Sequence, residues 1–221
     1  MLSVRDLEVR YGSTTTVFSG LGLEIRAGEA VAVMGPSGSG KSSLLACVTG
    51  MLVPSTGQVE VGGRVISMMS SSQRAAVRRE ALGLVYQGAD LLPELSVEEN
   101  VALTILFDGQ GRARALTRAR EALAQVGLAE HAGKRTDEIS GGQAQRVALA
   151  RALIRPSMQL LVADEPTASL DAANARQMTG LLLERTRACG AGALVATHDR
   201  SVADACDRVV ELRHEPAELV L

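Results

Sequence analysis

The first quarter of the chain alternates apolar and polar residues in the way typical of half-buried β-strands. Apolar residues recur over 4–9 and again over 21–25, with a Gly-Ser-Thr turn between the two runs. A third such stretch, residues 57–65, has the same character around a glycine pair. Because a strand with one buried face shows a period of two, these patterns predict an N-terminal subdomain of antiparallel strands.

From residue 29 onward the pattern changes to short apolar runs separated by helical stretches. The apolar runs predict buried strands at 29–34, 82–86, 159–163, 193–196 and 209–212. The stretches between them predict helices at 41–49, 71–80 and 174–189. Alternating strands and helices indicate an α/β protein with a mostly parallel sheet and flanking helices. Residues 214–221, after the last strand, are expected to be loosely held.

Residues 88–155 contain helical patterns without strands. Ser96 and Glu99 form a capping box at the start of one helix, and Gly109-Gln-Gly111 ends it. Further helices are predicted at 113–126 and 143–154, the second stopping near Pro156. We therefore predict one domain over residues 1–221, with residues 88–155 forming a helical subdomain inserted between two strands of the sheet.

Composition narrows the class of protein. A chain of 221 residues can bury one large core, and no apolar run reaches the length that crosses a bilayer. Its start lacks the layout of a signal peptide, so we expect a cytoplasmic protein that reaches a membrane only through a partner. The net charge of −2 argues against a nucleic-acid partner. Lys41 and Lys134 are the only lysines, and arginine supplies the rest of the basic charge. A lysine at position 41 is therefore a candidate functional residue.

Residues 35–42 read Gly-Pro-Ser-Gly-Ser-Gly-Lys-Ser and match the phosphate-loop pattern Gly-x4-Gly-Lys-Ser at every position. The run follows a predicted strand and opens a predicted helix, which is the context that the motif requires. Glycines let backbone N–H groups turn toward phosphate oxygens, the lysine can reach the outer phosphates, and the final serine can hold Mg²⁺. The residues expected to bind nucleotide are Gly35, Pro36, Ser37, Gly38, Ser39, Gly40, Lys41, Ser42 and Ser43.

A second anion-binding helix end is predicted at Ser140-Gly141-Gly142-Gln143, because a serine and two glycines open the helix at 143–154. One chain then carries two phosphate-binding helix ends. The simplest use of both is a dimer that holds nucleotide between them.

Carboxylates follow the apolar strand that ends at 163. Ligands gather at the carboxyl ends of the strands in an open parallel sheet, so Asp164 can hold Mg²⁺ through water. Glu165, one residue further, can contact the water that attacks the γ-phosphate. Without other motifs, this carboxylate pair would be interpreted as an acidic turn at the end of a strand. The phosphate loop earlier in the chain favours a functional role for the pair.

Two more polar residues follow strands at the same edge. The Gln87 amide can ligate Mg²⁺ and orient water, and it stands where the helical insertion begins. His198 can hydrogen-bond the γ-phosphate and the opposite loop. A polar loop residue is the alternative for a lone histidine, and that interpretation applies to His131 and His214.

Tyr11 and Asp171 complete the set of candidates. Tyr11 is one of four aromatic residues and ends the first strand, so its ring can stack on adenine; a role in the core or hairpin is the alternative. Asp171 can cap the helix that follows it, or its loop can cross to a second copy.

Taken in order, these motifs resemble the nucleotide-binding subunit of an ABC transporter over the whole chain. Tyr11 resembles the adenine-stacking aromatic, residues 35–42 the Walker A loop, and Gln87 the Q-loop glutamine. Ser140-Gly-Gly-Gln143 resembles the signature, with Ile139 where leucine is commoner. Asp164 and Glu165 resemble the Walker B acid and catalytic base, Asp171 the D-loop aspartate and His198 the switch histidine.

The resemblance implies a P-loop ATPase core, ATP and Mg²⁺ as ligands, and a head-to-tail dimer that serves a membrane permease. Residues 79–100 and 163–167 are similar to ATPases of the lipoprotein-release and macrolide-export group. The sequence differs from the commonest residues of that group at Gly88-Ala89-Asp90 and at Ala168-Ser169. The transported cargo and the direction of transport therefore stay open. Residues 88–95 should face the permease.

The alternative class is an ABC ATPase that acts on DNA or chromosomes. Such proteins separate the phosphate loop from the signature by long coiled-coil arms, whereas about 100 residues without a heptad run separate them in this chain. A nucleotide-binding regulator without hydrolysis would be expected to lack Glu165 or His198. Both residues are present, which favours an enzyme.

Overall fold

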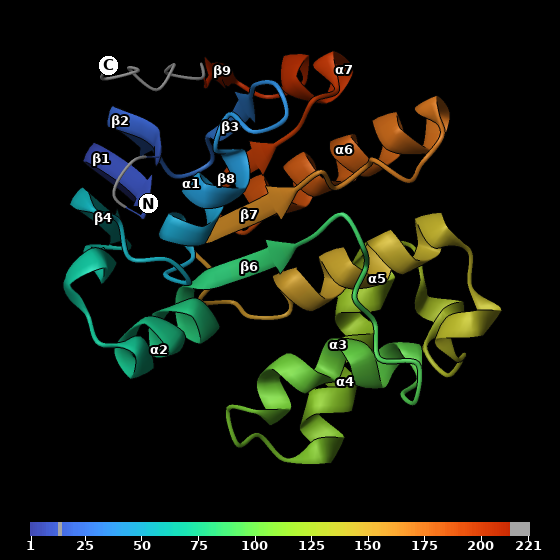
Figure 1. Ribbon diagram of the computed structural model, residues 1–221. Helices are drawn as coiled ribbons and strands as arrows, with labels where there is room; N and C mark the ends of the chain where they lie inside the picture. Colours follow the sequence, from blue (N-terminus) through green and yellow to red (C-terminus); the bar gives the residue numbers. More distant parts are fainter. Residues whose placement is uncertain (13–14, 213–221) are drawn as a thin grey trace, which may run out of the picture.

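The computed structural model describes residues 1–12 and 15–212, and it contains two sheets (Figure 1). The antiparallel sheet has the order β2-β1-β4-β5 and consists of β1 (Leu2–Tyr11), β2 (Thr15–Ile25), β4 (Thr56–Val61) and β5 (Arg64–Val65). The other sheet has the order β6-β7-β8-β3-β9, and all its pairs are parallel. It consists of β3 (Ala30–Met34), β6 (Leu82–Val85), β7 (Leu160–Asp164), β8 (Gly192–Ala196) and β9 (Arg208–Glu211). The predicted α/β class is confirmed; the expectation for 214–221 lies outside the described residues.

The first strand departs from strict alternation because it is bulged. Val4 and Leu7 are three positions apart, yet both are buried, with 2% and 0% exposure. The register against β2 shifts between them, and Asp6 adopts φ 48°. A β-bulge inserts one extra residue into a strand, so two residues that are three positions apart can face the same side of the sheet.

The parallel sheet is buried on both faces, which explains its continuous apolar runs. Alternate residues of one strand join different cores: Leu160 and Val162 pack toward the antiparallel sheet and α1 (Lys41–Val48). Leu161 and Ala163 pack with α5 (Gly141–Leu153) and α6 (Ala172–Ala188). The sheet is therefore the middle layer, and its strand ends are held from both sides.

Three helices lie between β6 and β7 in the sequence: α3 (Val97–Leu106), α4 (Arg112–Gln125) and α5. The predicted capping box opens α3, since Glu99 N–H donates to Ser96 Oγ at 3.3 Å and Ser96 N–H donates to Glu99 Oε2 at 3.0 Å. In Figure 1 these helices form a lower lobe beside the sheets. Within residues 1–12 and 15–212, no helix has the length and apolar character needed to cross a bilayer.

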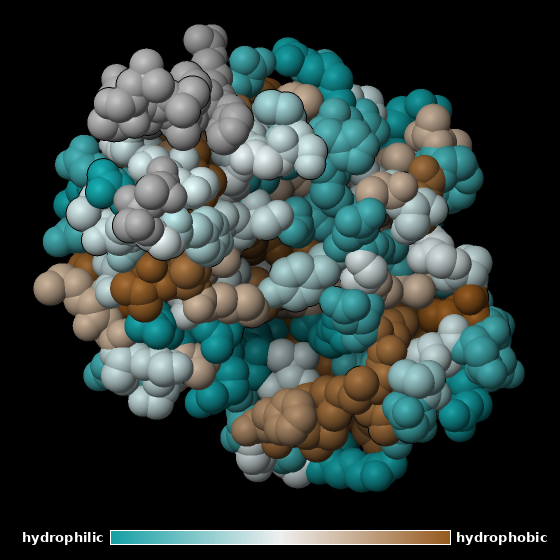
Figure 2. Space-filling view, viewed as in Figure 1, coloured by the Kyte–Doolittle hydropathy of each residue, from teal (hydrophilic) through white to brown (hydrophobic). Residues whose placement is uncertain are grey.

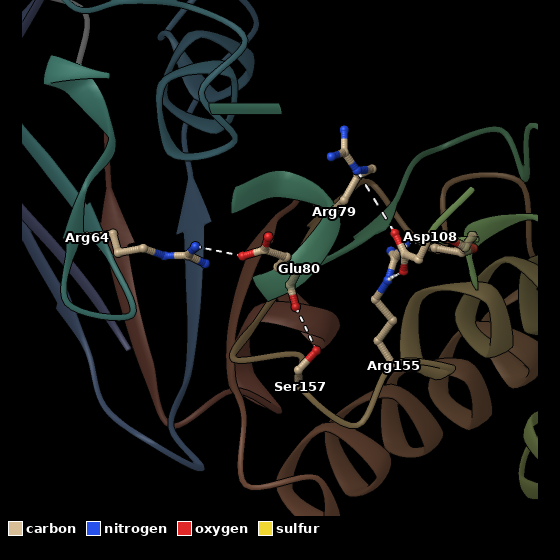
Figure 3. A network of polar contacts seen from close by, with 7 residues as sticks. Arg64, Arg79, Glu80, Asp108, Arg155 and Ser157 are labelled. Carbon is tan, nitrogen blue, oxygen red and sulfur yellow. Dashed lines mark hydrogen bonds and ion pairs between the residues drawn. The ribbon is translucent and has the colours of Figure 1, made fainter. Parts of the chain in front are cut away.

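A polar network joins this lobe to the sheet core (Figure 3). The nearly buried side chain of Arg155, just after α5, donates to Asp108 Oδ2 from Nε at 2.9 Å and from Nη2 at 2.8 Å, and also to the Thr104 carbonyl. Arg79, on α2 (Ser71–Ala81), lies 4.0 Å from the other carboxylate oxygen of Asp108. The end of α3 is thus fixed to α2 and to the segment that leads into β7.

Several short elements were not predicted, among them one α-helix and one 3-10 turn. The helix α7 (Arg200–Asp204) follows β8 and is capped by Asp199, whose carboxylate accepts from Ser201 N–H at 2.8 Å. Its five residues are too few to show a helical period. The 3-10 turn η2 (Ala129–His131) lies between α4 and α5.

Candidate active site

The loop between β3 and α1 leaves the first N–H groups of that helix open. Gly40 occupies the N-cap with φ 94°, and no side chain caps the helix. A Cβ at Gly40 would lie 2.6 Å from Val17 Cγ1 and 2.8 Å from Phe18 Cδ1, so both space and backbone conformation require glycine. An uncapped helix end with inward N–H groups is a site for an anion such as phosphate.

Lys41 lies over this loop. Its Nζ donates to the carbonyl oxygens of Gly35 at 2.6 Å and Pro36 at 3.2 Å. The ammonium therefore stands beside the same turn that presents the N–H groups, where it can exchange a carbonyl for a phosphate oxygen. Ser39 in this loop is 1% exposed, and among the described residues its hydroxyl has no hydrogen-bond partner.

Tyr11 reaches the start of α1. Its hydroxyl lies 3.3 Å from Ser43 Oγ, and the residue is 52% exposed. An exposed ring next to the phosphate-binding helix end can present a face to a base. The contact with Ser43 ties the antiparallel sheet to this loop.

Asp164 ends β7, and its carboxyl lies in an environment that disfavours the charge. Burial raises its pKa, the neighbouring Glu165 carboxylate raises it further, and Lys41 opposes both. A cation placed next to Asp164 would remove this penalty. Glu165 itself adopts φ 46°, an uncommon backbone state of the kind found at functional sites.

Glu165 and His198 are in direct contact. His198 Nδ1 lies 2.8 Å from Glu165 Oε1, and Thr197 Oγ1 donates to Oε2 of the same carboxylate at 3.3 Å. The contact follows from the sheet, because Asp164 pairs with Ala196 and the next residues of both strands are neighbours. The sequence placed Glu165 and His198 at one edge but did not predict this bond.

The phosphate loop and His198 share one cavity of about 530 Å³. Its lining includes Gly35, Pro36 and His198 together with Arg200 and Glu211. Strand ends β3, β7 and β8 therefore bring the loop, the carboxylate pair and the histidine to one edge of the sheet, as predicted for a parallel sheet.

The segment that carries Gln87 is fastened to α5. Gln145 Nε2 donates to the Gln87 carbonyl at 2.6 Å, and Arg151 donates to the carbonyls of Ala89 and Asp90, both at 2.7 Å. The Gln87 side chain is exposed. Neither Gln145 nor Arg151 was among the candidates, because their partners are backbone atoms that leave no signal in a sequence. The helix that begins at the signature thus holds the loop of Gln87.

Ser140 caps α5 through a capping box. Gln143 N–H donates to Ser140 Oγ at 3.3 Å, and Ser140 N–H donates to Gln143 Oε1 at 2.9 Å. Gly141 and Gly142 form the first turn, so no side chain covers it. These residues line a cavity of about 440 Å³ together with Asp171.

Asp171 caps α6, which was one of the two predicted roles for this residue. Its carboxylate accepts from the N–H groups of Ala173 at 3.0 Å and Asn174 at 2.9 Å. The bonds from Asn174 are the main cause that lowers the pKa of Asp171. The crossing of this loop to a second copy stays a prediction.

A phosphate loop opening a helix, with a carboxylate pair and a histidine at the adjacent strand ends, defines a nucleoside triphosphate hydrolase of the P-loop class. The particular family follows from comparison with known proteins. Residues 18–168 match the sequence model of the ABC transporter family, and the chain belongs to that family. It is therefore an ATP-binding cassette of an ATPase family.

Curated relatives align over most of the chain. It is 44% identical over 198 residues to a lipoprotein-releasing system ATP-binding protein, LolD 1, of Rhodospirillum rubrum, covering 89% of this chain and 87% of the relative. It is 46% identical over 205 residues to LolD of Novosphingobium aromaticivorans, covering 92% and 90%. The alternative of a DNA-acting ATPase gains no support from these relatives.

Solved structures give the same fold. The dimeric, post-hydrolysis structure of the cassette MJ0796 bound to ADP and Pi superposes with a TM-score of 0.84 at 31% identity, covering 96% of this chain and 94% of that one. CbiO1 of Clostridium perfringens, part of the transporter complex cbiONQ, superposes with a TM-score of 0.87 at 30% identity, covering 96% and 84%.

Proposed function

We propose that two copies of this chain bind head-to-tail and hold two ATP molecules between them. Each ATP would lie on the phosphate loop of one copy, with its adenine against Tyr11. It would be closed by Ser140-Gly141-Gly142-Gln143 of the second copy, with the Asp171 loops crossing between them. In other phosphoryl-transfer enzymes a charge clamp completed in trans gains ~10³–10⁵ in rate, so the isolated chain should hydrolyse ATP slowly and cooperatively.

The observation that carries this proposal is the separation of the two anion-binding helix ends. The phosphate loop and His198 line one cavity, whereas Ser140 and Asp171 line another, and the two linings have no residue in common. In Figure 1 the start of α5 lies toward the right edge of the view, away from β3 and α1. One copy therefore does not bring both ends to one triphosphate, and a second copy supplies the missing end.

Mg²⁺ fits a set of oxygen donors at the start of α1 and at the strand ends. The proposed ligands are the Ser42 hydroxyl, the Gln87 amide oxygen and, through water, the Asp164 carboxylate, all of them oxygen donors of the kind that Mg²⁺ prefers. The raised pKa of Asp164 supports a cation there. When bound, Mg²⁺ would offset charge on the β- and γ-phosphates.

Hydrolysis is assigned to Glu165, His198 and Lys41. Glu165 would accept the proton of the attacking water, since its carboxylate is already oriented by His198 and Thr197. Lys41 would exchange its contact with the Gly35 carbonyl for a γ-phosphate oxygen. Gln87 would orient the water and, through its bond to Gln145, link the state of the nucleotide to α5.

The hydrolysis would power a membrane permease of the lipoprotein-release or macrolide-export type, with this chain on the cytoplasmic face. The relatives named as lipoprotein-releasing ATP-binding proteins support this assignment. The proposed contact is residues 88–95, of which Leu92 is 46% exposed. Figure 2 shows a hydrophobic surface over the lower lobe of α3 and α4. Phe107, the residue that follows α3, is 77% exposed. Apolar side chains exposed together favour a protein contact.

The variant Glu165→Gln tests the proposal. The substitution keeps the shape of the side chain but removes the base. ATP should therefore bind without being hydrolysed. The purified variant should elute as a dimer only with ATP and Mg²⁺. Lys41→Ala in the same background is the control and should stay monomeric. Turnover equal to that of the parent, or an ATP-loaded monomer, would refute the assignment.

A further inference from the structure

His131 touches the signature segment, although a polar loop role was expected for it. It ends the turn η2, and its Nε2 lies 3.0 Å from Nε2 of Gln143. It lines the same 440 Å³ cavity as Ser140 and Gly141. Its backbone is fixed from both sides, because His131 N–H donates to Leu128 O and Lys134 N–H donates to His131 O, both at 3.0 Å.

The hydrogen bonds around Gln143 decide which proton His131 carries. Ser140 N–H must have an acceptor, so the amide oxygen of Gln143 faces it at 2.9 Å. The amide nitrogen therefore faces His131 and can only donate. His131 Nε2 must then accept, which places the ring proton on Nδ1.

The Nδ1 atom of His131 is buried, and among the described residues it has no hydrogen-bond partner. A buried donor without an acceptor costs stability. The ring therefore leaves the Nδ1 donor unpaired, at a cost in stability, while Nε2 accepts from Gln143. This arrangement is unexpected of a side chain that only fills space.

We propose that neutral His131, protonated at Nδ1, is a positioning residue of the signature. It fixes the Gln143 amide, Gln143 fixes Ser140, and Ser140 and the first turn of α5 are thereby held ready for the nucleotide of the second copy. The inference rests on the proposed dimer. The charged side chains that line the same cavity are Arg146, from α5, and Asp171, at the start of α6.

Two variants separate this role from simple packing. His131→Phe keeps a ring but removes the acceptor, and His131→Gln keeps an acceptor on a side chain without a ring. In the Glu165→Gln background, His131→Phe should raise the dissociation constant of the ATP-bound dimer by about tenfold for each of its two sites, the effect of one lost hydrogen bond per site. Its thermal midpoint and the affinity of its monomer for a fluorescent ATP analogue should stay at the level of the background.

His131→Gln should restore dimerisation to the level of the Glu165→Gln background, because its amide oxygen can accept the hydrogen bond from Gln143. Equal dimer affinity for His131→Phe and its background, or a His131→Gln variant that dimerises as weakly as His131→Phe, would overturn the proposal.

Nitrogen NMR of the histidine rings tests the tautomer directly, without a measurement of dimerisation. The chain has three histidines, so His131→Gln assigns the resonance by its disappearance. The expected spectrum at neutral pH has the proton on Nδ1 and an unprotonated Nε2; a proton on Nε2 would refute the proposal. If Glu165→Gln itself fails to dimerise with ATP, the proposed function fails, and the NMR result still decides the tautomer.

Discussion

Replacing Asp108 by alanine should loosen the inserted helices from the sheet core. Asp108 accepts two hydrogen bonds from Arg155, whose side chain is only 9% exposed, and lies within 4.0 Å of Arg79. In Asp108→Ala the guanidinium of Arg155 keeps its bond to the Thr104 carbonyl but loses its counter-ion. The change therefore leaves a nearly buried charge without its partner.

The structure sets the size of the effect. Hydrogen bonds to charged groups contribute about 1.5–3 kcal/mol each, and unpairing a fully buried charge costs about 3–5 kcal/mol. Asp108 is 33% exposed, so water can replace part of what is lost. We expect a loss of about 2 kcal/mol in the free energy of unfolding, which lowers Tm by roughly 4–8 °C in a chain of this size.

Urea unfolding followed by circular dichroism measures this loss. The matched control is Arg112→Ala, which breaks the ion pair with Glu99 at an arginine that is 73% exposed. An exposed pair contributes less than about 1 kcal/mol. Nucleotide affinity should be unchanged in Asp108→Ala, because the phosphate loop belongs to the sheet core, while hydrolysis should fall. Equal, small losses in the two variants would refute the reasoning.

Three further changes have expected outcomes. Lys41→Ala should weaken ATP binding by roughly 10- to 100-fold in a titration, because a charged hydrogen bond is lost and the only other lysine is Lys134. Asp164→Asn should raise Tm without nucleotide, because burial and Glu165 disfavour the ionised carboxyl, and it should abolish Mg²⁺-dependent hydrolysis. The gain in Tm should disappear as the pH falls through the raised pKa of Asp164 and the parent carboxyl takes up its proton. Asp207→Asn should behave in the opposite way. Hydrogen bonds from the Ala30 N–H and from Arg187 lower the pKa of Asp207. The contribution of Asp207 to stability is therefore present above the ordinary pKa of 3.8 and is lost as the pH falls through the lowered value. Tm measured from pH 7 to 3 should therefore show a deficit for Asp207→Asn at neutral pH that closes in acid.

The strands were predictable from the sequence because burial on one face leaves apolar residues with a period of two, and burial on both faces leaves a continuous apolar run. Strand β7 shows the second pattern, since Leu160 to Ala163 are all apolar and alternate between two cores. The phosphate loop was predictable for another reason: Gly40 occupies a backbone state and a space that only glycine fits.

The contacts between distant residues were not predictable in the same way. Glu165 and His198 meet because β7 pairs with β8, and the order of strands in a sheet leaves no mark on either strand alone. Gln145 and Arg151 bind backbone carbonyls of the Gln87 loop, which any residue could supply. His131 was assigned to a polar loop, because its partner Gln143 lies twelve positions away on another element.

Mixing two inactive variants tests most directly whether each copy completes the nucleotide site of the other. Lys41→Ala removes the phosphate-loop cation, and Ser140→Arg blocks the signature, so each variant alone should be inactive. A mixed dimer assembled in trans has one site with both lesions and one with neither, so an equal mixture should regain up to about a quarter of the parent ATPase rate. A mixture that stays as inactive as its components would contradict the account.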